Sequence, residues 1–411
     1  MRKMHYISAC MAAILALSAT GCSMNTTSST GSTTSANASG SYQAVSLSQT
    51  VTSTEASSEL FTNRDLAQTA DTSDATYLTV SDGETIDITA EGVYVISGSA
   101  QNCTIRVNAD ETAKIQLVLD GVTITNDDFP AIYVMSADKV FVTTTASENT
   151  LTVSGTFTAD GETNTDAVIF SKDDLTLNGT GTLNIISNDG NGVTCKDDLT
   201  ITGGTYNVTS ALDAFEANDS IAVSDGTFTV NTNKDGFHCE NDAAEGNITV
   251  TGGTFTINAQ SDGMQACGML RIDDGDITVT ASEGLEATYI LINDGKINIT
   301  ASDDGINAAA KSSAYEVVIE INGGELTVAV GQGDTDAIDA NGSIYVNGGT
   351  INITAQMSSF DYDKTAEFNG GTIIINGTEV SEIPQSMMGG GMQGGMQGGM
   401  GRSGGRQDRS F

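Results

Sequence analysis

The 411-residue sequence predicts an all-β fold, a right-handed parallel β-helix with three short strands per coil and an irregular N-terminal cap. Three observations predict this fold. Glycine is abundant, with 46 residues, whereas proline occurs only twice, a composition typical of many short strands joined by tight turns. A Gly-Gly or Asp-Gly turn followed by an alternating strand recurs between Gly204 and Gly371. Almost no window shows the 3.6-residue period of an amphipathic helix.

The recurring phrase sets the length of one coil. It appears as "GGTYNV", "DGTFTV", "GGTFTI", "DGDITV", "DGKINI", "GGELTV", "GGTINI" and "GGTIII". Its second glycines are Gly204, Gly226, Gly253, Gly275, Gly295, Gly324, Gly349 and Gly371, separated by 22, 27, 22, 20, 29, 25 and 22 residues. Self-similarity at this period, with strand-like alternation, predicts a solenoid whose extra residues lie in loops between the coils.

Each period contains three strand-like pieces. The first is an alternating run such as "LTITG" or "IYVNG", and the second follows the glycines, with Tyr206 and Val208 on one face. The third is an acidic turn followed by an apolar residue and usually alanine, as in "DGINA" from Asp304. Stacking of equivalent strands predicts a β-helix over residues 76–376, in which residues 76–155 form the irregular first coils and the cap.

The first segment has the pattern of an export signal. Arg2 and Lys3 precede an apolar run from Ile7 to Leu17, and "SATGC" ends at Cys22. Small residues directly before a cysteine resemble the lipobox of bacterial lipoproteins, which implies a signal peptide over residues 1–21 and acylation of Cys22. The alternative is an ordinary secretory signal with an incidental cysteine. The lipobox reading predicts an exported, membrane-anchored lipoprotein at the cell surface.

Two further segments have low-complexity compositions. Residues 22–75 are dominated by Ser, Thr and Ala and predict a flexible tether, because they cannot bury a core. Residues 377–411 are rich in Met, Gly and Gln and predict a disordered tail. The body between them is expected to be monomeric.

The formal net charge of −37 limits the class of partner. Such a charge repels nucleic acid and anionic membrane surfaces and attracts cations. We therefore expect no nucleic-acid partner, and metal ions or basic partners are favoured.

The acidic turns predict a column of like charge. Alternation directs the apolar third and small fifth residues of each third strand inward, and the fourth residue outward beside the turn carboxylate. Equivalent residues in neighbouring coils lie about 4.8 Å apart, where unit charges repel by about 1 kcal/mol even in bulk water. Bound Ca²⁺ would relieve this repulsion. The candidate ligands are Asp213, Glu216, Asp235, Asp262, Glu283, Glu286, Asp303, Asp304, Asn307, Asp336 and Asp339.

Two alternatives to Ca²⁺ remain open. Raised carboxylate pKa values would also relieve the repulsion, and the acidic residues could simply form a solvated face that keeps a repetitive β-protein soluble. A zinc site is not expected, because His238 points outward and Cys103, Cys195, Cys239 and Cys267 have no zinc-ribbon spacing. These cysteines are predicted to be small buried residues.

Residues from about Thr76 to Asn376 resemble the bacterial family of calcium-bound, carbohydrate-binding right-handed β-helix proteins related in fold to polysaccharide lyases. The resemblance is carried by "GVYVISG", "LVLDGVTIT", "PAIYVMSADKV", "SKDDLTLNGTGTL" and "CKDDLTITGGTYNV", and by the repeated turns. It implies binding of acidic polysaccharide, polygalacturonate in particular, without cleavage. Where this family often has Lys after the acidic turn, the chain has Glu216, His238 and Glu286.

Three classes of function are therefore weighed. The first is a lipid-anchored protein that binds acidic polysaccharide through a Ca²⁺-loaded surface, with only Tyr and Phe available to stack on sugars, since Trp is absent. The second is a Ca²⁺-dependent lyase, which needs a base such as Lys311 or Arg271. The third is a structural stalk or adhesin. We expect the first, with no catalytic residue, because the lysines and arginines are read as isolated surface cations.

Overall fold

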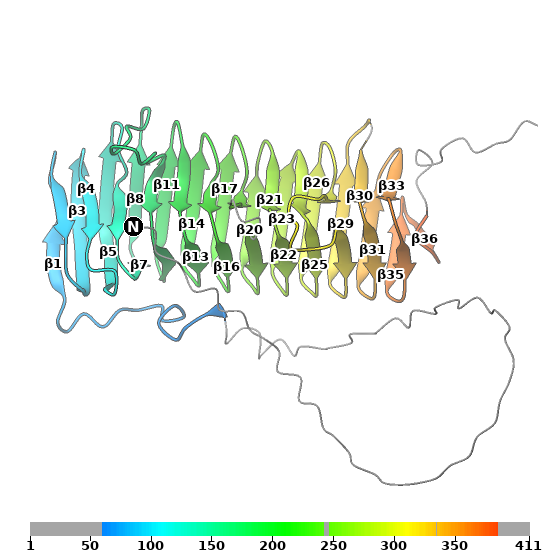
Figure 1. The fold of residues 1–411 in the computed structure, drawn as a ribbon, viewed down its shortest axis with the longest axis horizontal. Helices are drawn as coiled ribbons and strands as arrows, with labels where there is room; N and C mark the ends of the chain where they lie inside the picture. Colours follow the sequence, from blue (N-terminus) through cyan, green and yellow to red (C-terminus); the bar gives the residue numbers. More distant parts are fainter. Residues whose placement is uncertain (1–59, 242–245, 334, 385–411) are drawn as a thin grey trace, which may run out of the picture. The chain divides into compact units, whose positions relative to one another are not determined.

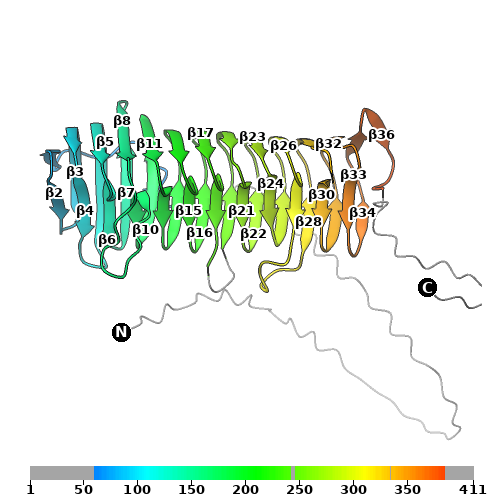
Figure 2. The ribbon, with the colours of Figure 1, turned by 90° about the horizontal axis from the view of Figure 1, so that it is seen from above.

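The computed structural model describes residues 60–241, 246–333 and 335–384. They form an all-β parallel solenoid, which Figure 1 shows from the side and Figure 2 from above. The predicted fold class is thereby confirmed as an all-β parallel solenoid. The predicted signal peptide, Cys22, the tether up to residue 59 and the tail from residue 385 lie outside the described residues. Within the described ranges, no helical segment has the length and apolar character needed to cross a membrane.

The strands follow one another with short connections. In chain order they are β1 (Thr76–Thr79), β2 (Thr85–Ile88), β3 (Gly92–Gln101), β4 (Thr104–Asn108), β5 (Lys114–Asn126), β6 (Ile132–Ser136), β7 (Lys139–Thr144), β8 (Glu148–Val153), β9 (Ala167–Ser171), β10 (Asp174–Gly179), β11 (Thr182–Ser187), β12 (Asn191–Cys195), β13 (Asp198–Ile201), β14 (Thr205–Ser210), β15 (Phe215–Ala217), β16 (Ser220–Val223), β17 (Thr227–Thr232), β18 (Phe237–Cys239), β19 (Asn247–Val250), β20 (Thr254–Asn258), β21 (Asp262–Ala266), β22 (Met269–Ile272), β23 (Asp276–Ala281), β24 (Glu283–Ala287), β25 (Tyr289–Ile292), β26 (Lys296–Ala301), β27 (Ile306–Ala308), β28 (Val318–Ile321), β29 (Glu325–Val330), β30 (Asp336–Ala340), β31 (Ser343–Val346), β32 (Thr350–Thr354), β33 (Ser358–Tyr362), β34 (Ala366–Phe368), β35 (Thr372–Ile375) and β36 (Thr378–Val380).

Strand pairing follows a period of three through most of the chain. Strand β10 pairs in parallel with β13, β11 with β14, and β12 with β15. The line of strands that contains β12 runs from β2 to β33 as a sheet of twelve strands among the described residues. The other two lines join one larger sheet. Equivalent side chains of successive coils are thus brought into columns.

The core is a set of such columns. In the twelve-stranded sheet, Val193 pairs with Phe215, which pairs with Phe237, and the column continues through Met264, Leu285, Ile306 and Ile338. All of these side chains are buried. The rings of Phe215 and Phe237 stack with centroids 4.7 Å apart. The inward direction predicted for the third residue of each acidic turn is therefore confirmed.

The second glycine of every recurring phrase has a positive φ. The values lie between 81° at Gly349 and 140° at Gly226. Residues with a Cβ avoid this conformation, so glycine is required where the chain turns into the next strand. The four cysteines that the sequence placed inside are buried and free.

The C-terminal end corrects one predicted boundary. Strand β36 lies within the predicted tail and pairs antiparallel with β35. Asn376 and Gly377 between them have φ values of 50° and 79°. An Asn-Gly pair with two positive φ angles is the usual two-residue hairpin turn, so the chain reverses there and closes the end of one sheet.

The predicted tether also ends earlier than residue 75. Residues 60–68 lie on the outside of the solenoid, with Phe61 and Asp65 buried. The Asp65 carboxylate is 2.9 Å from Nζ of Lys139. The buried ring and the paired carboxylate help to hold this short segment, and an average over composition does not detect them.

Candidate functional site

Two polar columns run side by side along the twelve-stranded sheet. The turn column contains Asn191, Asp213, Asp235, Asp262, Glu283, Asp304 and Asp336. The outer column contains Thr194, Glu216, His238, Gln265, Glu286, Asn307 and Asp339, and each member pairs with the next in strand register. The structure therefore brings together every predicted metal ligand except Asp303, whose side chain is exposed beside the columns.

The turn column is a hydrogen-bonded ladder. The backbone N–H of Asp235 donates to Oδ1 of Asp213 (3.0 Å), and that of Asp262 donates to Oδ1 of Asp235 (3.0 Å). The N–H of Asp336 donates in the same way to Oδ1 of Asp304 (2.7 Å). The side chains of Asp213, Asp235 and Asp262 are at most 4% exposed. A solvated acidic face does not describe these three residues.

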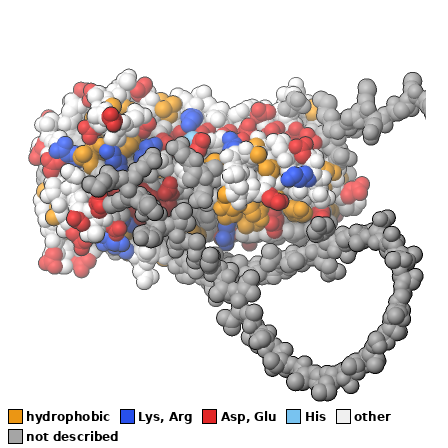
Figure 3. All heavy atoms as spheres, in the orientation of Figure 1, with side chains coloured by type: hydrophobic (Ala, Val, Ile, Leu, Met, Phe, Trp, Pro, Cys, Tyr) orange, Lys and Arg blue, Asp and Glu red, His pale blue; other side chains and the backbone are white. Residues whose placement is uncertain are grey.

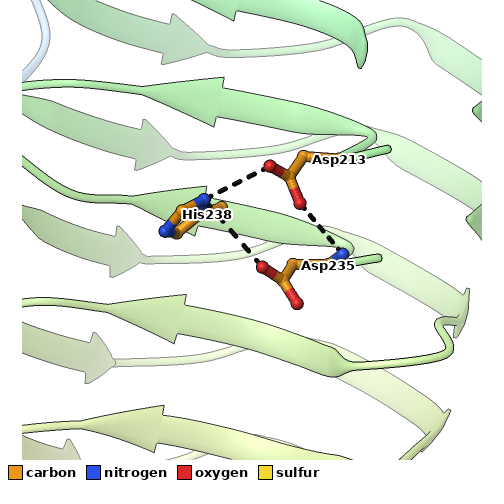
Figure 4. A group of neighbouring side chains, drawn as sticks. All are labelled: Asp213, Asp235 and His238. Atoms are coloured by element: carbon orange, nitrogen blue, oxygen red, sulfur yellow. Dashed lines mark hydrogen bonds and ion pairs between the residues drawn. The ribbon is translucent and has the colours of Figure 1, made fainter. Parts of the chain in front are cut away.

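Cations of the protein neutralise the first section of the columns. Nζ of Lys234 lies 2.8 Å from Oδ2 of Asp213 and 3.7 Å from Oδ2 of Asp235. The His238 ring points between the same carboxylates, with Nδ1 3.3 Å and 3.9 Å from them (Figure 4). Nζ of Lys196 lies 3.0 Å from Oε1 of Glu216. The reading of the lysines as isolated surface cations is wrong for Lys196 and Lys234.

These contacts move the pKa values in opposite directions. Burial raises the pKa of Asp213, but hydrogen bonds from His238 and Lys234 outweigh it and leave the pKa lowered. Burial and the neighbouring charge of Asp213 raise the pKa of Asp235. Burial lowers the pKa of His238, but its hydrogen bond to Asp213 leaves the pKa raised. The first section therefore holds its charge balance through a Lys, a His and two carboxylates.

The second section is more acidic. Oxygens of Asp262, Glu283 and Glu286 lie within 4.8 Å of one another. Burial and the charges of Asp235, Glu286 and Glu283 raise the pKa of Asp262 to about 8. Nζ of Lys311 is 2.8 Å from Oε2 of Glu286, so Lys311 is not an isolated cation either. One ammonium faces three carboxylates in this acidic triad, which we define as Asp262, Glu283 and Glu286.

The third section joins Asp304, Asn307, Asp336 and Asp339. Nδ2 of Asn307 donates to Oε2 of Glu283 at 2.9 Å and links this section to the acidic triad. Burial raises the pKa of Asp339 to about 7, and the charges of Asp304, Asp336, Asp361 and Asp363 add to the rise. Part of the repulsion in the columns is thus relieved by raised carboxylate pKa values, which is one of the alternatives to Ca²⁺.

A polar groove of about 450 Å³ lies next to the columns. It is lined by Ser187, Asn188, Thr209, Ser210, Ala211, Asn231, Thr232, Asn233, Asn258, Ala259, Gln260 and Thr280. Exposed amides form ladders along it, with Nδ2 of Asn258 donating to Oδ1 of Asn231 (3.2 Å) and Nε2 of Gln260 donating to Oδ1 of Asn233 (2.9 Å). Asn233 and Gln260 each precede a turn-column aspartate by two residues, so the groove leads into the columns.

The structure also shows an acidic cluster that the sequence analysis did not single out. Oxygens of Asp174, Asp197 and Asp198 lie within 4.8 Å of one another. Burial and neighbouring carboxylates raise the pKa of Asp174 to about 6 and that of Asp197 to about 7. The repeated phrase "KDDLT" was the available signal. More widely, Figure 3 shows acidic side chains over much of the visible face, with Lys and Arg in separate small groups.

We expect replacement of Lys234 by methionine to destabilise the protein. The change leaves the buried Asp213 without its ammonium partner, which costs about 3 to 5 kcal/mol for a fully buried pair. Because the Lys234 side chain is 43% exposed, solvent screening reduces the expected loss to about 2 kcal/mol. Lys296→Met is the matched control, since Lys296 and Asp276 form an exposed pair 3.9 Å apart. Equal unfolding midpoints for the two variants in urea would contradict a compensating role for Lys234.

Comparison with known proteins gives two findings. A family model described as "Carbohydrate-binding domain-containing protein" matches residues 82–337 and 289–399. Among solved structures, the chain is similar to the "polysaccharide lyase-like protein from C. thermocellum, Gadolinium derivative", with 27% sequence identity and a TM-score of 0.48. That match covers 54% of this chain and 96% of the other. No curated protein matches the chain significantly.

Proposed function

The chain belongs to the family of carbohydrate-binding domain-containing proteins, and from this premise we propose that it binds an acidic polysaccharide of the polygalacturonate type without cleaving it. The polymer lies in the polar groove, and Ca²⁺ held by the neighbouring acidic triad binds its carboxylates. The protein acts outside the cell, anchored through lipidated Cys22.

The groove is the observation that carries the proposal. Its lining consists almost entirely of hydroxyl and amide side chains, which can both donate to and accept from sugar hydroxyls. The exposed amides are held in ladders, so they lose little conformational freedom when a ligand binds. Successive coils contribute equivalent residues, as in the row Thr209, Asn231, Asn258 and Thr280, and this repetition suits a polymer of repeating sugars.

The acidic triad fits Ca²⁺ better than the first section does. Asp262, Glu283 and Glu286 offer only oxygen atoms, which are the ligands that Ca²⁺ takes, and burial together with the neighbouring carboxylates raises the pKa of Asp262. Near Asp213 and Asp235 the ammonium of Lys234 already supplies a cation, and His238 supplies nitrogen. When bound, the ion would supply the positive charge that a polyuronate requires.

The position of the acidic triad supports a shared ion. Gln260 and Thr280 line the groove, and they precede Asp262 and Glu283 by two and three residues. A protein with a formal net charge of −37 repels a polyuronate at long range. An ion shared between the triad and the polymer's carboxylates converts this repulsion into attraction.

The lysines next to the columns support binding without cleavage. A lyase base has to accept a proton at neutral pH. Burial lowers the pKa of Lys311, but its hydrogen bond to Glu286 and the nearby carboxylates leave the pKa raised. Arg271, the other candidate, lies 2.7 Å from Asp273. Lys311 is therefore poorly suited to abstract a proton, and the Arg271 guanidinium is already engaged by Asp273.

We expect retardation of the protein in a polygalacturonate gel with Ca²⁺ and none with a chelator. A neutral glucan gel is the control polymer. The double variant Asn233→Ala, Gln260→Ala should lose retardation, because it removes one rung of the groove ladder. Asn207→Ala is its control, since Asn207 forms a similar ladder with Asn184 (2.9 Å) but is not among the residues that line the groove.

Other outcomes would point elsewhere. Retardation that survives the chelator would contradict a Ca²⁺ bridge. Absence of retardation in both gels would favour a structural stalk or adhesin. An unsaturated uronide product formed by the wild-type protein and absent with Lys311→Ala would establish a lyase.

A further inference from the structure

Residues 60–68, which we call the strap, lie across the outside of β7, β10 and the end of β13. Lys139 Nζ is 2.9 Å from the Asp65 carboxylate, and Thr176 Oγ1 donates to the same carboxylate at 2.7 Å. Thr202 donates through Oγ1 to the Asp65 carbonyl, and Asn178 donates to it through Nδ2 at 3.0 Å. These contacts join residues more than 70 positions apart in the chain.

Gln68 and Arg64 extend the contact in two directions. Oε1 of Gln68 accepts from the N–H of Gly179 at 2.9 Å, and its Nε2 donates to the carbonyl of Thr202 at 2.9 Å. The guanidinium of Arg64 lies 4.3 Å from the centroid of the Phe141 ring. The strap therefore meets a charge, several hydrogen-bonding groups and an aromatic ring.

The surface under the strap, the strap face, consists of Lys139, Phe141, Thr176, Asn178 and Thr202. In β7 and β10 these residues alternate with Val140, Val142, Leu175 and Leu177, which belong to the core. The strap face thus points away from the core, although Phe141, Thr176, Asn178 and Thr202 are buried. A polar outer face buried by a short segment of the same chain is a surface that becomes available when the segment leaves.

Two hydrogen bonds within the solenoid also hold the strap face, although Nη2 of Arg64 in the strap donates to Oε1 of Gln116 at 3.5 Å. Oγ1 of Thr143 donates to Oδ1 of Asn178 at 2.6 Å, and Nε2 of Gln116 donates to Oγ1 of Thr143 at 3.1 Å. This network directs the Nδ2 group of Asn178 outward. The face needs little rearrangement to bind another ligand with an acceptor in the same place.

The contacts of the strap match those of a uronic acid residue. Lys139 and Thr176 bind a carboxylate, Asn178 and Thr202 offer donors to oxygen acceptors, and Phe141 offers a ring on which a sugar can stack. We propose that the strap face is a second acidic-sugar subsite and that the strap is an internal competitor, with Asp65 in the place of the uronate carboxylate. The inference rests on the proposed preference for acidic polysaccharide but uses a surface different from the groove.

Competition has a physical basis in this chain. Residues 60–68 are tied to the solenoid through β1, so the strap is present at a high effective concentration and a weak ligand displaces it poorly. A polymer that already occupies the groove raises the local concentration of uronate and favours the exchange. Weakening the strap without altering the strap face should therefore increase affinity.

The experiment measures the affinity of the full-length protein for a short galacturonate oligomer. A chelator is present so that Ca²⁺-dependent binding does not contribute. We expect Asp65→Asn to bind the oligomer at least tenfold more tightly than the wild type, because the strap loses its ion pair with Lys139. Asp71→Asn, three residues beyond the strap and exposed, should change nothing. Adding Lys139→Met to Asp65→Asn should abolish the gain.

A second readout follows the strap itself. An arginine-specific protease cuts after Arg64 only when the strap is released from Phe141. We expect the galacturonate oligomer, and not a neutral glucan oligomer, to accelerate this cut in the wild-type protein. Unchanged cutting together with unchanged affinity of Asp65→Asn would overturn the proposal and leave the strap as a permanent structural clasp.

The two proposals fail in distinguishable ways. Suppose that the wild type shows Ca²⁺-dependent retardation in polygalacturonate, but that neither the affinity of Asp65→Asn for the oligomer nor the rate of cutting after Arg64 changes. The strap subsite is then wrong and the proposed function stands. If retardation, cutting and the affinity of Asp65→Asn all show no response to galacturonate, both proposals are wrong.

Discussion

Replacing Gly181 by alanine should destabilise the solenoid by about 3 kcal/mol or more, at the upper end of the cost of overpacking. A Cβ at this position would stand 1.8 Å from the carbonyl oxygen of Thr145 and 2.5 Å from that of Ser147. Both are backbone atoms of the preceding coil, and they cannot move without shifting the strands on either side. Relief would require these two coils to separate where the N–H of Thr182 donates to Ser147 O at 2.9 Å.

Gly121→Ala is the matched control for this change. Gly121 has a φ of +74°, but a Cβ there would meet nothing within 4 Å. Its substitution should cost about 1 kcal/mol, from backbone conformation alone. Urea unfolding followed by β-type circular dichroism compares the two. A Gly181 variant no less stable than the Gly121 variant would show that the coils can separate locally.

The register of the solenoid could be predicted because the same turn and strand patterns recur in successive coils of the sequence. A positive-φ glycine and an alternating strand recur in each coil, and a shift by one residue would turn Phe215 or Leu285 to the solvent. The two polar columns follow directly from this register. Their strand pairings, such as Glu216 with His238 and Asn307 with Asp339, are those expected from the aligned turns.

The partners of the columns could not be predicted in the same way. Lys234 lies in a turn, and Lys311 lies in the long connection between β27 and β28. The repeat period does not predict which carboxylate the ammonium group of such a long side chain contacts. The contacts of the strap are even harder to predict from the sequence, because Asp65 binds Thr176 and Lys139, which are far from it along the chain. The Asn376-Gly377 hairpin, by contrast, carried a local signal that the composition of the tail obscured.

The groove depends on both kinds of information. Alternation places Asn231 and Asn258 outward in successive coils, so their ladder is a consequence of register. The depth of the groove depends on how the loops before the acidic turns are folded, and the unequal coil lengths do not determine that. Sequence therefore predicts the chemistry of the groove lining better than its shape.

The metal-free protein should lose stability as pH rises from about 5 to 8, the reverse of ordinary acid denaturation. The folded-state pKa of Asp262, about 8, lies above its ordinary value of 3.8. The folded protein thus holds a proton that the unfolded chain releases, and stability falls with pH across this window. His238, whose pKa is also raised, contributes in the same direction, because its favourable charge is lost as pH rises.

Asp262→Asn isolates the contribution of the acidic triad. The neutral amide has nearly the same shape as the protonated carboxyl, so this variant should be more stable than the wild type at pH 8 without metal, because the wild type must hold a proton that the solvent at this pH takes up from an ordinary carboxyl. Asp303→Asn is the control, because Asp303 is exposed. Thermal melts at pH 5 and pH 8 in a chelator measure the difference, and parallel pH profiles for wild type and Asp262→Asn would contradict it.

Adding Ca²⁺ at pH 8 should make the wild type more stable than Asp262→Asn, the reverse of their order without metal. The ion binds ionised carboxylates, so its affinity grows as Asp262 loses its proton. At 100 times the dissociation constant, a ligand that binds only the folded state adds about 2.7 kcal/mol to stability. The wild type should gain this stability, whereas Asp262→Asn loses one oxygen ligand and should gain far less. If neither protein responds to Ca²⁺ at pH 8, the triad relieves its repulsion by holding a proton, and the polysaccharide must be bound without a bridging ion.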